Sequence, residues 1–93
     1  MMSESNMVTY ADGMITVDVI WYKLTVDPSK VLVNMNIRDF KKMLRICCNA
    51  LPFYDDQVRY LYLWFTYLTE RTEYDPFKRR RMKNAIDERL GKL

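Results

Sequence analysis

The residue types that carry out most enzyme chemistry are scarce in this 93-residue sequence, which has no histidine and only two cysteines. Histidine is the commonest general base and the commonest metal ligand, so its absence removes both roles together. Cys47 and Cys48 are adjacent, whereas a structural zinc site usually needs four Cys or His ligands. Cys47 also falls on the apolar side of a predicted helix, where a thiol is usually inert. We therefore expect no metal centre and no cysteine nucleophile.

Carboxylates could hold magnesium, but every acidic cluster here has a simpler explanation. Asp55 and Asp75 precede predicted helices as N-caps, and Asp87 can pair with Lys83 one turn earlier. The two glycines do not form a phosphate-binding loop. The sequence therefore predicts a protein that is not an enzyme and that uses no cofactor and no small-molecule substrate. The acidic clusters to which this explanation applies are Asp55-Asp56, Glu70-Glu73-Asp75 and Asp87-Glu88.

Basic residues are concentrated near the C-terminus, where residues 70–93 hold eight Lys or Arg and five Asp or Glu and so account for the whole net charge of +3. Guanidinium groups bind phosphate well, which favours a nucleic-acid surface. The basic run at residues 78–83 also points all around its helix and has acidic residues close by. A solvated helix is therefore equally expected. The nucleic-acid hypothesis uses Lys78, Arg79, Arg80, Arg81 and Lys83, extended by Arg38, Lys42 and Arg45.

Aromatic side chains recur at one-turn spacing in the helix before the basic run. Tyr60, Trp64 and Tyr67 form this aromatic stripe, with Leu63 beside it and Arg71 one turn further on. Tyrosine, tryptophan and arginine are the types enriched at the centres of protein interfaces. The alternative is burial, with a sheet on one face and helices on the other. Because a helix that is apolar nearly all round needs nearly complete cover, we expect part of the stripe to contact a second molecule.

The second half of the chain has a helical period. Asn36 is a good N-cap, and the apolar residues that follow it recur every three or four positions up to Pro52. A second helix follows Asp55 or Asp56, and a third follows Asp75 with Pro76 at its first position. The predicted helices span about residues 37–51, 56–70 and 76–90.

The first half alternates as strands do. We expect strands at 7–10, at 14–26 and at 30–35, with a turn at Asp12-Gly13. The alternation changes phase within 14–26, which we interpret as a β-bulge near residues 19–21; a strand covered on both faces is the alternative. For 30–35 the alternative is a helix that begins at Asp27 with Pro28 in its first turn. We favour the strand because Val31 and Val33 alternate.

The elements predict an α+β protein in which a short antiparallel β-meander, about residues 7–35, is followed by three α-helices. Residues 7–93 are expected to form one compact domain after a disordered segment at 1–6. The longest nearly apolar run, 60–68, is far shorter than the roughly 20 residues that cross a bilayer. With no visible signal peptide and two adjacent cysteines, we expect a cytoplasmic protein that does not enter membranes.

The function expected from these features is that of a small regulator or inhibitor, which binds a partner protein or a second copy of itself. A short, histidine-free chain rich in Met and Tyr is typical of accessory proteins of viruses and mobile elements, in which case the compartment is the host cytoplasm. The partner-binding residues would be Tyr60, Leu63, Trp64, Tyr67 and Arg71. The alternative is a nucleic-acid-binding protein that uses the arginine-rich C-terminal helix.

Overall fold

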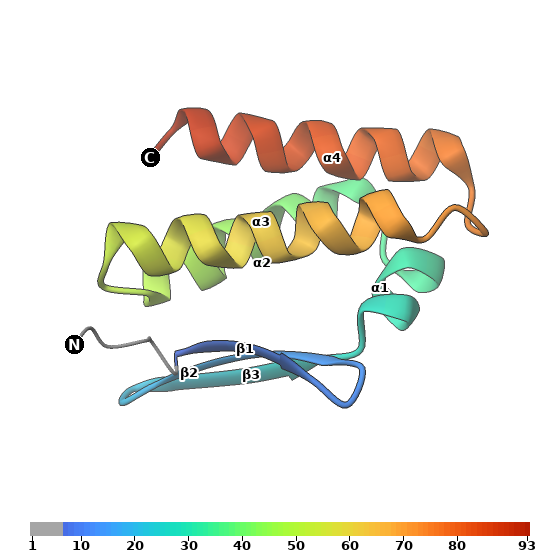
Figure 1. Ribbon diagram of the computed structural model, residues 1–93. Helices are drawn as coiled ribbons and strands as arrows, with labels where there is room; N and C mark the ends of the chain where they lie inside the picture. The colour runs from blue at the N-terminus through green and yellow to red at the C-terminus, as the bar shows by residue number, and fades with distance from the viewer. Residues whose placement is uncertain (1–6) are drawn as a thin grey trace.

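The computed structural model describes residues 7–93 and has the expected α+β fold, with three antiparallel strands followed by four helices rather than three. Figure 1 shows three layers: the sheet, then helices α2 (Ile37–Ala50) and α3 (Tyr54–Glu70), and then α4 (Pro76–Gly91) on the far side. Helix α4 packs against both α2 and α3. The middle helices are therefore covered from two sides, which decides which side chains are buried.

Strands β1 (Val8–Ala11) and β2 (Met14–Val19) form the first hairpin, with Ala11 opposite Met14. The two residues between them, Asp12 and Gly13, have φ values of 55° and 76°. Positive φ at both central positions is the type I′ geometry whose twist matches that of the flanking strands. The turn predicted at Asp12-Gly13 is confirmed.

The predicted β-bulge near residues 19–21 is wrong, because the chain reverses there. Strand β2 ends at Val19, β3 (Tyr22–Val26) begins at Tyr22, and these two residues are paired across a two-residue turn. The turn explains the change of phase, since Ile15, Val17 and Val19 pair with Val26, Leu24 and Tyr22 and all six face the same side of the sheet. The phase of the apolar residues alone does not distinguish a bulge from a tight turn.

The predicted strand at 30–35 is also wrong, because residues Pro28–Asn34 form helix α1. The Asp27 carboxylate caps this helix by accepting hydrogen bonds from the backbone N–H and the hydroxyl of Ser29, at 3.0 and 2.6 Å. Pro28 occupies the first turn, where its missing N–H costs nothing. Val31 and Leu32 are buried next to each other, as a helix allows and a strand with one covered face does not.

The three longer helices begin and end within two residues of the predicted bounds. Asn36 caps α2 and accepts a hydrogen bond from the backbone N–H of Asp39 at 2.8 Å, and Asp75 caps α4 with a bond from Phe77 N–H at 2.9 Å. Helix α3 starts at Tyr54 with no side-chain cap, so Asp55 and Asp56 lie inside its first turn rather than at its N-cap. Acidic residues there still suit the helix dipole.

Candidate functional site

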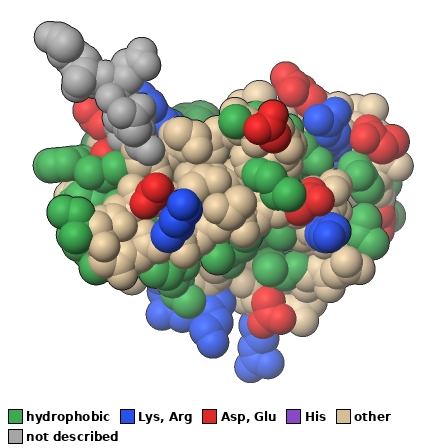
Figure 2. Space-filling model, turned by 90° about the horizontal axis from the view of Figure 1, so that it is seen from below, with side chains coloured by type: hydrophobic (Ala, Val, Ile, Leu, Met, Phe, Trp, Pro, Cys, Tyr) green, Lys and Arg blue, Asp and Glu red, His purple; other side chains and the backbone are tan. Residues whose placement is uncertain are grey.

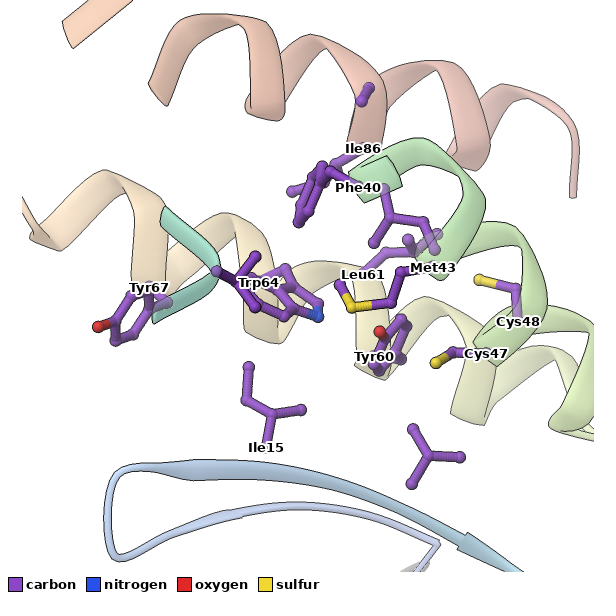
Figure 3. Packing of buried hydrophobic residues seen from close by; sticks show 14 of the residues in the cluster. Ile15, Phe40, Met43, Cys47, Cys48, Tyr60, Leu61, Trp64, Tyr67 and Ile86 are labelled. Carbon is purple, nitrogen blue, oxygen red and sulfur yellow. The ribbon is translucent and has the colours of Figure 1, made fainter. Parts of the chain in front are cut away.

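The aromatic stripe lies in the core, which corrects its expected exposure. Tyr60, Trp64 and Tyr67 are 1%, 0% and 7% exposed. Figure 3 shows the three rings along α3, with Ile15 of the sheet on one side and Phe40 of α2 on another. The Trp64 ring meets the Phe40 ring edge-to-face with centroids 5.2 Å apart. The short chain covers this helix completely here because it stacks α3 between the sheet and α4.

Two polar atoms are buried along with these rings. The Tyr60 hydroxyl and the Trp64 indole N–H have no hydrogen-bond partner of good geometry, although Cys47 and Trp64 lie close enough to the hydroxyl to influence its pKa. Burial raises the pKa of Tyr60 well above its ordinary value and raises the pKa of Cys48 to about 11. The same cause raises the pKa of Cys47. Both cysteines are therefore neutral thiols at physiological pH, which makes them poor nucleophiles.

The outer surface of α3 carries a groove of about 430 Å³ beside β1, which we call the α3 groove. Its helical residues recur at every turn from Arg59 to Glu70, Arg71 follows directly after the helix, and Tyr10 of β1 forms part of the opposite wall. Tyr62 lines the groove with 55% of its surface exposed. Three of the predicted partner-binding residues line this groove. The groove comprises Tyr10, Arg59, Tyr62, Leu63, Thr66, Tyr67, Glu70 and Arg71.

Arg71 closes one end of the α3 groove by contact with two tyrosines. Its guanidinium carbon lies 4.8 Å from the centroid of the Tyr67 ring, a cation–π contact. The Tyr10 ring meets the Tyr67 ring edge-to-face at 6.1 Å. The nearby Tyr67 and Tyr10 hydroxyls raise the pKa of Arg71 above its ordinary value, and a guanidinium is charged at physiological pH in any case. This end of the groove thus presents a fixed cation on an aromatic base.

Within the basic run, three side chains make contacts inside the protein. Arg79 donates to the backbone oxygens of Leu68 and Tyr74, both at 3.3 Å, and so joins the start of α4 to the end of α3. Lys78 donates to the backbone oxygen of Val33 at 3.3 Å. The Lys83 ammonium lies 5.6 Å from the centroid of the Phe65 ring. Arg80 and Arg81 are left exposed.

A separate basic surface lies on α2. The predicted residues Arg38, Lys42 and Arg45 are all exposed there. Arg81 of α4 reaches this side, since it lines a shallow hollow together with Lys41 of α2. Lys41 also forms an ion pair with Glu88 at 3.8 Å. The structure therefore places Arg81, but not the whole basic run, beside Lys41 of α2.

Several large apolar side chains are exposed that we did not predict as surface residues. Ile20 and Trp21, in the turn between β2 and β3, are 100% and 65% exposed, and Phe53 and Tyr54 are 60% and 62% exposed. Figure 1 places the β2–β3 turn and the α2–α3 connection at the same end of the molecule, and Figure 2 shows hydrophobic side chains gathered at that end. For Ile20 and Trp21, the sequence did contain a signal of exposure, because these two adjacent bulky residues lie where the alternation of apolar residues changes phase.

The part of the chain that the structure describes offers neither a metal cluster nor a membrane-spanning helix. Residues 7–93 contain no group of three or more His, Cys, Asp or Glu side chains placed to hold a metal ion. None of the helices in that range combines the length and the apolar character needed to span a bilayer. Comparisons of the chain with protein-family models, curated proteins and solved structures find no match.

Proposed function

We propose that this protein is a small non-enzymatic regulator or inhibitor that acts by binding a partner protein through the α3 groove. The observation that supports the proposal is the groove itself, an apolar hollow of about 430 Å³ walled by three tyrosines. Tyrosine supplies a large contact area for little loss of conformational entropy, and Arg71 adds a cation held in one position. A cytoplasmic location and an accessory role for a virus or mobile element belong to the same proposal.

The partner class that fits the α3 groove is a protein segment with an apolar side chain for the hollow and polar groups for its ends. Arg59 and Arg71 lie at opposite ends of the lining stripe, and Glu70 stands beside Arg71. A groove with apolar walls and charged ends resembles the usual arrangement of interfaces, which have an apolar centre and a polar rim. The central residues Tyr62 and Leu63 would then contribute most of the affinity.

Nucleic-acid binding is the second candidate, and the observation that favours it is the α2 surface. Arg38, Lys42 and Arg45 are exposed along one helix, with Arg81 close to its first turns. Phosphate contacts would make such binding fall steeply with salt. The candidate is second because Lys78, Arg79 and Lys83 have contacts within the protein.

Affinity capture with matched variants tests the groove. Tyr62→Ser removes a ring from the groove, whereas Tyr54→Ser removes an equally exposed ring from the same helix outside it. Proteins should be captured from nuclease-treated lysate by the wild type and by Tyr54→Ser, and lost with Tyr62→Ser. For a purified partner, Tyr62→Ser should weaken binding at least about tenfold, the effect of losing an interface hot spot.

Three results would contradict the proposal. Equal capture by both variants would place the interface elsewhere. Equal loss with both variants would indicate an effect of general surface apolarity. Binding that disappears with nuclease and falls steeply between low and physiological salt would support the nucleic-acid candidate instead.

A further inference from the structure

The hydrogen-bonding register shows which backbone groups of β3 point away from the sheet. The Asp18 N–H donates to the Met7 oxygen at 2.8 Å, so the backbone groups of Asp18 point toward β1 and those of Val17 and Val19 toward β3. The partners of these two residues in β3 are Leu24 and Tyr22. The intervening residues of β3, Lys23 and Thr25, therefore direct their N–H and C=O groups outward.

The outer edge of β3 is open. The strand order β1-β2-β3 makes β3 an edge strand, and both Lys23 and Thr25 are exposed. Within residues 7–93, no backbone hydrogen bond connects their outward groups to another segment. The β1 edge differs, because one of its two outward-facing residues, Val8, is only 3% exposed. Unpaired edge groups in an exposed strand are a template for a further strand.

The side chains of β3 leave an apolar row partly uncovered along the same edge. Tyr22, Leu24 and Val26 face the helices, yet all three are only half-buried, whereas Ile15 and Val17 of the neighbouring β2 are each 1% exposed. The row contains no charged residue, and inward-facing charges are one of the devices that prevent edge strands from pairing. A further strand beside β3 would cover this row.

We propose that β3 pairs antiparallel with the β3 strand of a second copy of this chain, which joins the two sheets into one of six strands. A two-fold axis allows the same edge to act as donor and acceptor on both copies. Cover of the apolar row would come from the same residues of the partner, so one surface both pairs outward backbone groups and covers apolar side chains.

Charge selects the register of this pairing. If Lys23 faced its own copy, two like charges would be opposed, which is destabilising. If Leu24 faced its own copy, Lys23 would lie opposite Thr25 and gain no carboxylate beyond Asp18 of β2, with which it already forms an ion pair at 4.0 Å. If Thr25 faces its own copy, Lys23 lies opposite Asp27, which continues the extended backbone after β3. The Asp27 carbonyl is already bonded to Lys30 and Val31 in α1, and the bonds from Ser29 use one oxygen of its carboxylate, so its contribution here is the charge. Two opposite-charge pairs then flank a Thr–Thr pair, and Leu24 lies opposite Val26 on the apolar row. This register places Thr25 on the two-fold axis.

A proline substitution tests the pairing. Thr25→Pro removes an N–H that does not bond to β2, and an edge strand tolerates proline at such a position. Thr25→Ala is the matched control, because it loses the same 3.1 Å contact with the Thr16 hydroxyl but keeps the N–H. In sedimentation equilibrium, wild type and Thr25→Ala should form a dimer of the 11.3 kDa chain, and Thr25→Pro should weaken dimerisation at least about tenfold. Circular dichroism checks that each variant is folded.

Cysteine crosslinking tests the register and does not depend on the proline variant folding. A hydrogen-bonded antiparallel pair has Cα atoms about 5.5 Å apart, which is within the range that a disulfide spans. Thr25→Cys should therefore form a covalent dimer on mild oxidation. Lys23→Cys lies on the same strand and face, but its two copies would be more than about 13 Å apart and should not crosslink. The native Cys47 and Cys48 are buried.

A wild-type chain that stays monomeric up to about 1 mM would overturn the inference, as would a dimer that Thr25→Pro leaves unchanged while folded. Crosslinking of Lys23→Cys as efficient as that of Thr25→Cys would overturn it as well. These measurements use purified protein and do not involve the α3 groove. Failure of either proposal therefore leaves the other standing.

Discussion

At the scale of single residues, neighbours in the basic run have different environments. Arg79 is half-buried and satisfies two backbone oxygens near the junction of α3 and α4, whereas Arg80 is exposed. The last carbonyls of a helix have no partner within that helix, so a side-chain donor at the end of α3 adds stability. Charge at position 79 thus has a structural role that composition alone does not reveal.

We expect Arg79→Ala to lower the free energy of unfolding by about 1–3 kcal/mol, because it removes two hydrogen bonds from a charged donor. Arg80→Ala is the matched control and should change it by less than about 0.5 kcal/mol. Equilibrium unfolding in urea measures both. Equal effects of the two variants would mean that the Arg79 contacts add nothing.

At the scale of elements, the two β-hairpins reverse the chain with different backbone conformations in their turns. The first turn uses Asp12 and Gly13 with positive φ. The second uses Ile20 and Trp21, which do not have positive φ, and it exposes both side chains. Turns without positive φ fit the twist of paired strands less well. The sequence of the second turn is therefore not optimised for stability.

Substituting both turns should give opposite results. Replacing Ile20 and Trp21 with Asn and Gly should raise the free energy of unfolding by about 0.5–1 kcal/mol, because this pair favours the type I′ turn. Gly13→Ala should lower the free energy of unfolding by about 1 kcal/mol, because its φ of 76° is unfavourable for a residue with a Cβ. A Cβ there meets no other atom within 4 Å, so this backbone strain is the only expected cost. Thermal and urea unfolding measure both changes. A destabilised Asn-Gly variant would show that Trp21 contributes packing.

At the scale of the whole molecule, the stacking of three layers determines what α3 does. The helix is apolar on two faces, and the sheet, α2 and α4 cover both, so the stripe joins the layers rather than two proteins. The face of α3 that these layers do not cover is the one that lines the α3 groove, and it includes Tyr62 and Leu63. The core face and the proposed binding face are thus adjacent on one helix.

Trp64→Ala should destabilise the fold by about 3–5 kcal/mol, a large part of the stability of a domain this small. Tyr60→Phe should cost less than about 0.5 kcal/mol or stabilise the fold, because it removes a buried hydroxyl that has no good hydrogen bond. Tyr62→Ser should have little effect, since Tyr62 is exposed. Urea unfolding measures all three. A folded and stable Trp64→Ala variant would contradict the packing described here.

Local signals in the sequence predicted much of the fold. The α+β class, the Asp12-Gly13 turn and the caps at Asn36 and Asp75 all depend on residues within a few positions of one another. The misread segments, 19–21 and 30–35, are those in which short-range patterns are ambiguous. Two alternating valines fit a strand or a short helix, and only packing of Val31 and Leu32 into the core decides between them.

The candidate site was less predictable than the fold. By itself the sequence determined that α3 is apolar on two faces, that the charge excess lies near the C-terminus, and that histidine chemistry is absent. Only the tertiary structure decided that Tyr60 and Trp64 are buried while Leu63 and Arg71 line a groove. The physical reason is that periodicity fixes which residues share a helix face, whereas the cover of that face depends on contacts between segments far apart in the chain.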